Sequence, residues 1–391
     1  MDISFYFEPI DLEGYHADRS IDRDRLINRM EIFSDKDHFP EINGLNIAIF
    51  GVGEDRAANG NKGCADGPTR VRDFLFNLYS HWKHLRIADL GNINRGHHIE
   101  DSYFAIREVL TFLLKNGIIP IIIGGSQDIS YANYTAYENI GKVINFCAVD
   151  PKFDLGHDED ELSSASYLSR IIMHQPNFLF NYTNIGYQTY YVDEDALVLM
   201  KNLYFDAYRL GKVRAEMEEI EPMIRNVDVM SFDISAIRQT DAPGNFYANP
   251  NGFSGEEACR ICRYAGISDK LSSIGFYEYN PSFDVNGQTA KLLAQMIWYF
   301  IDGVAHRKDD LPENGPDQFV RFIVKTEAFD EDLVFLKSKK TERWWIEMQA
   351  SNQIREKYRR HQFIPCSYAD YQSALNHEIP DRWWKMQQKL M

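Results

Sequence analysis

The segment Phe146-Cys-Ala-Val-Asp-Pro-Lys-Phe-Asp154 decides the fold, because a short apolar run ends there in charged side chains. The segments Ile121-Ile-Ile-Gly-Gly-Ser-Gln-Asp128 and Val227-Asp-Val-Met-Ser-Phe-Asp-Ile-Ser235 repeat this pattern. Such runs predict buried parallel strands, and in open α/β sheets ligands bind beyond the carboxyl ends of the strands. The polar side chains that follow the runs are therefore expected to gather in one crevice: Gln127, Asp150, Lys152, Asp154, Asp233 and Ser235.

Predicted strands alternate with predicted helices along most of the chain. One helix can be capped at Asp101 or Ser102 and ends at Gly117, and a long apolar helix covers 289–301. Apolar strands that alternate with helices indicate a parallel sheet covered on both faces. We therefore predict a three-layer α/β/α fold with a central, mainly parallel sheet over residues 46–325. Its strands are expected at 46–52, 118–124, 143–150, 182–188, 227–234, 272–279 and 319–325.

The two ends of the chain differ from this central part in composition. Residues 1–45 are charged and irregular, and we expect a lead-in that packs on the main domain. Residues 326–391 hold four of the six tryptophans and two basic clusters. We expect a C-terminal extension whose aromatic side chains dock on the main domain. The alternative is a surface for a protein partner or for self-association into a homo-oligomer.

Composition excludes several classes of protein. An apolar content of 44% and a charged content of 26% are typical of globular proteins. The formal charge of −16 argues against a nucleic acid or an anionic membrane as a partner. We expect a cytoplasmic protein, since there is no signal-peptide pattern and no apolar run of membrane-spanning length. Among five scattered cysteines, Cys259 and Cys262 form a CxxC that fits one face of a helix better than a zinc or redox site.

Several segments resemble, in their order along the chain, the ureohydrolase superfamily of arginase, agmatinase and formimidoylglutamase. The resemblance covers about residues 45–325 and implies an arginase-like fold. Each motif alone is weak evidence, but several of them in the family's order are strong evidence for the fold. The segments are Asn61-Lys-Gly-Cys-Ala-Asp-Gly-Pro-Thr-Arg-Val-Arg72, Ile185-Gly-Tyr-Gln188, Asp241-Ala-Pro-Gly244 with Pro250-Asn-Gly252, and Tyr277-Glu-Tyr-Asn-Pro281 with Asp284.

The family holds two manganese ions with six side chains, and the resemblance implies that only three of them are kept here. The three retained aspartates are Asp150, Asp154 and Asp233. Two histidine ligands and one aspartate ligand are replaced, by Gln127, Lys152 and Ser235 respectively. Glu278 stands where family hydrolases hold the guanidinium or amidine group, so the resemblance gives it and the three aspartates catalytic positions. Two manganese ions are not expected.

Three carboxylates gathered in a buried place need a counter-charge. A charged ammonium has no lone pair and cannot bind a metal, so Lys152 is expected to replace the ion and to lie within salt-bridge reach of Asp150 or Asp233. The alternative is a single divalent ion, manganese or magnesium, which prefers oxygen ligands. The ligands of this single ion would be Asp150, Asp154, Asp233 and Gln127. A third possibility is a rearranged site that recruits His157.

Two functions follow from these substitutions. The first is a pseudoenzyme, a ureohydrolase-fold protein that has lost binuclear catalysis and binds a partner or a small ligand. The second is a working formimidoylglutamase-type hydrolase of C–N bonds in linear amidines, with one metal or an atypical site. Glu278 and the Ala242-Pro-Gly244 loop favour the second function. The substituted ligands favour the first, which we prefer.

Overall fold

The computed structural model describes residues 1–13, 23–156, 161–325, 332–348 and 358–390. Within this part of the chain a ten-stranded sheet lies at the centre, in the order β1-β4-β3-β5-β10-β9-β6-β7-β8, with β2 paired to β4. All its strand pairs are parallel except β1 with β4. The strands are Phe7–Glu8 (β1), Glu31–Ile32 (β2), Ile47–Val52 (β3), Ile87–Ile93 (β4), Ile119–Ile123 (β5), Ile144–Val149 (β6), Leu179–Tyr187 (β7), Asp206–Arg209 (β8), Val229–Asp233 (β9) and Ser273–Tyr277 (β10).

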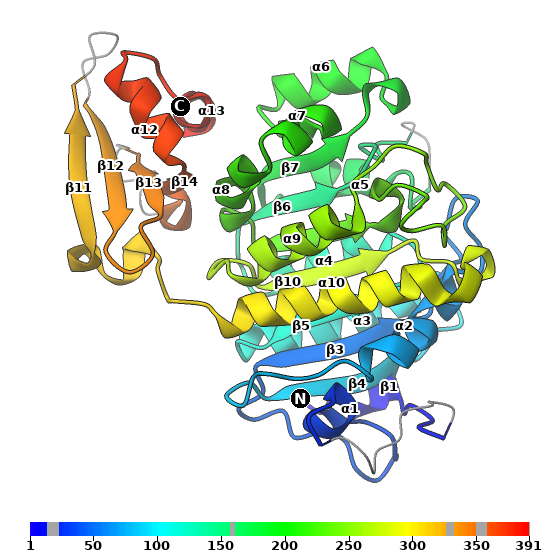
Figure 1. The fold of residues 1–391 in the computed structure, drawn as a ribbon. Helices are drawn as coiled ribbons and strands as arrows, with labels where there is room; N and C mark the ends of the chain where they lie inside the picture. Colours follow the sequence, from blue (N-terminus) through cyan, green and yellow to red (C-terminus); the bar gives the residue numbers. More distant parts are fainter. Residues whose placement is uncertain (14–22, 157–160, 326–331, 349–357, 391) are drawn as a thin grey trace.

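Helices cover both faces of this sheet, which confirms the predicted three-layer α/β fold (Figure 1). The alternation of side chains within a strand explains the two cores. In β5, Ile121 and Ile123 pack with α9 and α10, whereas Ile122 packs with α3 and α4 on the opposite face. The helices are Leu26–Arg29 (α1), Gly67–Leu75 (α2), Ile99–Lys115 (α3), Ile129–Asn139 (α4), Tyr167–Met173 (α5), Glu194–Asn202 (α6), Leu210–Ala215 (α7), Ile220–Arg225 (α8), Gly255–Gly266 (α9) and Gln288–Ala305 (α10).

Strand β4 was not predicted, because polar residues interrupt its apolar run. The carboxylate of Asp89 is fully buried there and accepts two hydrogen bonds from the buried guanidinium of Arg72, at 2.8 and 2.9 Å. Arg72 also donates to the side chain of Asn92 and to the main-chain oxygen of Gly91. This network joins α2 to the sheet. A polar strand is stable here because each polar group has a partner.

The C-terminal part forms a second, antiparallel sheet of its own, in the order β11-β12-β13-β14. The prediction that residues 319–325 close the main sheet was wrong, because they form β11, the first strand of this second sheet. The unit therefore begins near residue 319, not at 326. Its elements are Phe319–Val324 (β11), Leu333–Ser338 (β12), Trp344–Glu347 (β13), Phe363–Cys366 (β14), Tyr368–Leu375 (α12) and Asp381–Leu390 (α13). We call residues 319–390 the C-terminal unit.

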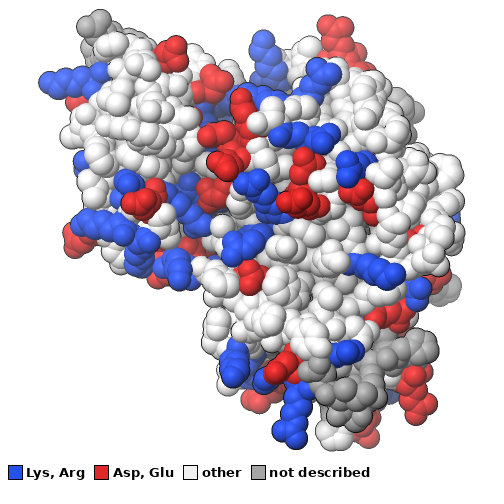
Figure 2. Space-filling view, viewed as in Figure 1, with Lys and Arg blue, Asp and Glu red and all other residues white. Residues whose placement is uncertain are grey.

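The tryptophans of the C-terminal unit mainly build its own cores. Trp344 and Trp383 pack in one cluster and Trp345 in another, and all three are buried. Figure 1 shows the unit beside α8 of the main domain, and Lys385 of α13 pairs with Asp206 of β8. The buried guanidinium of Arg225 in α8 lies 4.3 Å from the centre of the Trp345 ring and donates to the Cys366 main-chain oxygen. On the face seen in Figure 2, acidic and basic side chains gather along this boundary.

The structure also bears on the N-terminal lead-in, on the paired cysteines and on membrane-spanning helices. The N-terminal lead-in contributes β1 and β2 to the edge of the main sheet, as well as packing on it. Cys259 and Cys262 lie buried as free thiols in α9, consistent with one helix face. No helix among the described residues is long and apolar enough to cross a membrane.

Candidate functional site

The strand order explains why the candidate residues meet. Strands β5, β10, β9 and β6 are four consecutive neighbours, all parallel, so their carboxyl ends form one continuous rim. Each strand ends in polar residues. Gln127 follows β5, Glu278 follows β10, Asp233 ends β9 and Asp150 follows β6. These four side chains are at most 8% exposed, so they form a buried polar cluster at the rim.

Glu278 is held in place from three sides. One carboxylate oxygen accepts from the main-chain N–H of Gln127 at 2.8 Å, and the other accepts from the Asn61 amide at 2.7 Å. The Asn245 amide donates to the main-chain oxygen of Glu278 at 2.7 Å. The backbone of Glu278 has a φ of 68°, a strained conformation for a non-glycine residue, which is often found at functional sites. Burial raises the pKa of Glu278 to about 7, although the hydrogen bonds from Asn61 and Gln127 oppose this.

Gln127 contributes amide N–H groups to the cluster. Its Nε2 donates to the Tyr167 hydroxyl at 3.2 Å and to the Ser231 hydroxyl at 3.1 Å, which uses both N–H groups of the amide. The Gln127 amide thus directs its two donors to hydroxyl groups at the rim, and it acts there as a hydrogen-bonding side chain.

Asp150 and Asp154 behave as a pair. Burial raises the pKa of both groups, and the neighbouring Asp150 carboxylate raises that of Asp154 further. Asp150 Oδ1 accepts from the main-chain N–H of Lys152 at 2.7 Å, whereas the buried Asp150 Oδ2 has no hydrogen-bond partner among the described residues. Two neighbouring buried carboxyl groups favour the protonated form of the pair.

Lys152 lies over an aromatic ring. Its Nζ is 4.2 Å from the centre of the Tyr247 ring, within the range of a cation–π interaction. Burial alone would lower the pKa of Lys152, but the carboxylates of Asp154, Asp150 and Asp233 outweigh it and raise the pKa. Within the described part of the chain, no carboxylate oxygen lies within 4.0 Å of Nζ. The expected contact of Lys152 with Asp150 or Asp233 is therefore not formed, and the ammonium acts on the carboxylates from a greater distance.

Asp233 and Ser235 form a local turn at the end of β9. Asp233 Oδ1 accepts from the main-chain N–H of Ser235 at 2.7 Å, and the Ser235 hydroxyl also hydrogen-bonds to it. Burial raises the pKa of Asp233 well above its usual range, and the charges of Asp150 and Glu278 add to this effect. Ser235 thus serves Asp233 as a hydrogen-bond donor.

The donor set does not fit the two manganese ions that the family resemblance implies. Lys152 brings an ammonium to the rim, and the Gln127 amide directs its Nε2 to the hydroxyls of Tyr167 and Ser231. Within the described residues, no three His, Cys, Asp or Glu side chains are arranged to hold one ion. The single-ion site of Asp150, Asp154, Asp233 and Gln127 stays a prediction, which requires these side chains to move. His157 lies outside the described residues.

Sequence reasoning missed three residues that shape the cluster: Asn61, Asn245 and Tyr247. All three lie in or beside segments that carry the family resemblance, but none stands at the end of a strand. Asn61 is fully buried and links Glu278 to the loop around 245–247, because its Oδ1 accepts from the main-chain N–H of Phe246. The signal that could have found them is residue type, since a buried side-chain amide must bond to polar neighbours.

Comparisons with known proteins find relatives that match most of the main domain. A family model described as the arginase family matches residues 45–302. Formimidoylglutamase of Staphylococcus haemolyticus is 24% identical over 296 residues, covering 70% of this chain and 89% of that protein. Formimidoylglutamase of Klebsiella pneumoniae is 25% identical over 268 residues, covering 65% and 84%.

Solved structures share the fold. Formimidoylglutamase of Bacillus subtilis superposes with a TM-score of 0.66 at 17% identity, covering 76% of this chain and 96% of that one. Formiminoglutamase of Trypanosoma cruzi, solved with manganese, gives a TM-score of 0.64 at 20% identity, covering 73% and 99%. At such identities the likeness establishes the architecture alone.

Proposed function

The chain belongs to the arginase family and is distantly related to formimidoylglutamases, and we propose that it is a non-catalytic member of this family. In this proposal the position that binds two metal ions in the family is filled by an internal network of carboxylates, amides and one lysine. The protein then acts by binding a partner or a small ligand, and not by hydrolysing amidines.

The observation that carries this proposal is the position of Lys152. Its ammonium lies on Tyr247 at the rim that also bears Asp150, Asp154 and Asp233, and these carboxylates raise its pKa. A divalent ion at this rim would be repelled by the ammonium, and a hydroxide nucleophile depends on metal ions to lower the pKa of water. The chain therefore lacks the means to generate that nucleophile in the manner of a two-metal hydrolase.

A second function, hydrolysis of a linear amidine, is favoured by one observation. Glu278 is held between Asn61 and the main chain of Gln127, and burial raises its pKa to about 7, a value suited to acid–base chemistry near neutral pH. The formimidoylglutamase relatives point the same way. Such an enzyme would still need a nucleophile other than a hydroxide bridging two metals.

The experiment that separates the two functions is an amidine-hydrolysis assay on the full chain, with and without added manganese. Formimidoylglutamate, arginine and agmatine are the substrates. We expect no turnover above the rate measured with a Glu278→Ala variant, which removes the carboxylate. Turnover of any of the three by the wild type, lost in that variant, would put the hydrolase first.

A further inference from the structure

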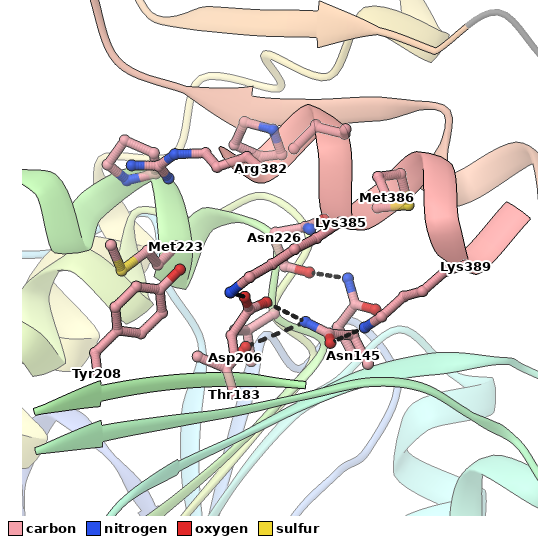
Figure 3. A pocket seen from close by; sticks show the side chains of 15 residues that line it. Asn145, Thr183, Asp206, Tyr208, Met223, Asn226, Arg382, Lys385, Met386 and Lys389 are labelled. Carbon is pink, nitrogen blue, oxygen red and sulfur yellow. Dashed lines mark hydrogen bonds and ion pairs between the residues drawn. The ribbon is translucent and has the colours of Figure 1, made fainter. Parts of the chain in front are cut away.

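A second polar cavity lies at the opposite edge of the main sheet from the carboxylate cluster. It sits between α13 of the C-terminal unit and the amino ends of β6, β7 and β8 (Figure 3). The cavity offers about 50 Å³ to the centres of water-sized atoms. Since one water needs roughly 10–15 Å³ by this measure, there is room for a few waters or for one compact molecule.

One face of α13 forms the roof. Arg382, Lys385, Met386 and Lys389 follow one another at spacings of three, one and three residues, which places them on the same side of a helix. Figure 3 shows Lys385 and Lys389 extending from the helix toward the strands below. The sequence therefore lays two flexible cations over the amino ends of the strands.

The two lysines differ in how well they are compensated. Lys385 forms an ion pair with Asp206 in β8, at 2.7 Å. Lys389 donates to the Asn181 amide oxygen, and among the described residues no carboxylate lies within 4.0 Å of its Nζ. The Asn181 amide also donates to Asp206 at 2.9 Å, so the carboxylate is already occupied on both oxygens. Lys389 is thus a largely enclosed cation whose contacts are neutral groups, the Asn181 amide and the rings of Phe180 and Phe205. Burial lowers its pKa to about 8, although the Asp206 carboxylate opposes this.

An unpaired acceptor belongs to a side chain that lines the same cavity. Asn145, which lines it from β6, is 2% exposed, and its Oδ1 has no hydrogen-bond partner. The orientation of this amide is fixed by its other end, since Nδ2 donates to the main-chain oxygen of Asn226 at 2.7 Å. A buried acceptor without a partner costs free energy, and such groups in native proteins commonly face a ligand or water.

We propose that this cavity binds a compact organic acid that carries an O–H or N–H donor, the class of 2-hydroxy acids and α-amino acids. The carboxylate of the ligand pairs with Lys389, and its hydroxyl or ammonium group donates to Asn145 Oδ1. Met223, Met386 and the ring of Tyr208 line the same cavity and restrict the ligand to a small side chain. Because the ligand contacts both α13 and β6, it joins the C-terminal unit to the main domain.

The probes are chosen so that each differs from glycolate in one group. Glycolate and glycine carry both the carboxylate and the donor, acetate lacks the donor, and ethylene glycol lacks the carboxylate. Calorimetric titration of the full chain should show saturable binding of glycolate or glycine, at least tenfold weaker binding of acetate, and none of ethylene glycol. Larger members, L-lactate and L-alanine, test the size of the site.

Matched variants locate the binding. Lys389→Gln keeps a donor for Asn181 but removes the charge, and should weaken glycolate binding at least tenfold, whereas Lys389→Arg should retain most of it. Lys36→Gln removes an exposed lysine from the N-terminal part of the chain and should change nothing. Circular dichroism of each variant checks that it is folded. The ligand should also slow proteolysis at the boundary between the main domain and the C-terminal unit.

Two outcomes would overturn this proposal. The first is the absence of saturable binding of any probe at about 10 mM, far above the Kd of a useful metabolite site. The second is binding that Lys389→Gln leaves unchanged, or that acetate matches in strength. Neither outcome bears on the carboxylate cluster, so the proposal is tested independently of the loss of metal catalysis.

Discussion

The ammonium of Lys152 lies 4.2 Å from the centre of the Tyr247 ring, on the rim that carries Asp150, Asp154 and Asp233. Burial opposes a charge on this lysine, and the ring face and the three carboxylates together retain it. The Lys152 ammonium stays charged although it forms no close ion pair with any of these carboxylates. In the proposed account this ammonium supplies the counter-charge that metal ions supply in the family.

The Lys152→Met variant should be destabilised in a pH-dependent manner. Asp154 and Asp233 have raised pKa values in the folded protein. Their contribution to the free energy of unfolding is therefore fully present below their unfolded pKa values, and it is lost as the pH rises through the folded pKa values. Without the ammonium these folded values rise further. We expect a loss of about 2 kcal/mol near pH 8, and a much smaller one near pH 4, from urea unfolding.

Manganese should stabilise Lys152→Met more than it stabilises the wild type. Removing the ammonium ends the repulsion and leaves the carboxylates available to an ion. A ligand that binds only the folded state adds about 2.7 kcal/mol at a hundredfold excess over its Kd, so a thermal melt will detect it. An equal rise in Tm for the wild type and the variant would show that Lys152 does not occupy the place of an ion.

Tyr247→Leu tests the ring contact alone. Loss of the cation–π interaction should cost about 1 kcal/mol of unfolding free energy. Tyr247→Phe keeps the ring and is the matched control, so it should lie within about 0.5 kcal/mol of the wild type. If both variants were equally destabilised, the ring of Tyr247 would not stabilise the Lys152 ammonium.

Asp233→Asn should stabilise the protein at neutral and alkaline pH. The amide oxygen can still accept from the Ser235 main-chain N–H, and one buried charge disappears. Because the folded pKa of Asp233 is raised, the wild type loses stability as the pH rises through that value, and the variant does not. The gain should therefore grow between pH 4 and pH 8 in urea unfolding. Asp37→Asn, at an exposed position, is the control.

Much of this site was predictable because strand ends are marked by where an apolar run stops. The segments ending at Gln127, Asp150 and Asp233 were expected at one sheet edge, and the strand order places them there. The order itself, with β10 between β5 and β9, could not be read from local patterns, since it depends on packing between distant segments. The contact between Lys152 and Tyr247 was missed for the same reason, because the two residues are far apart in sequence.

Two parts of the fold were beyond sequence reasoning for different reasons. Strand β4 was concealed by Asp89, which is buried only because Arg72 on α2 provides a partner. The C-terminal sheet was concealed by its aromatic content, which suggested side chains docking on another domain. In the structure Trp344 and Trp345 belong to β13 and pack within the unit itself.

The Arg72 and Asp89 pair offers a test of how such a strand is stabilised. Arg72→Met should cost about 3–5 kcal/mol, because it leaves the Asp89 carboxylate buried and unpaired. The double variant Arg72→Met with Asp89→Leu should recover most of that loss, since both charges are then removed. Chemical unfolding measures both. A double variant as unstable as the single one would mean that shape, and not charge, determines the cost.

The most direct test of the central claim is the number of manganese ions bound per chain, measured by elemental analysis after loading and dialysis. It should be made on the wild type and on the triple variant Gln127→His, Lys152→His and Ser235→Asp, which restores the six ligands of the family. We predict no retained manganese in the wild type and two ions in the triple variant. Two ions per wild-type chain would contradict the account.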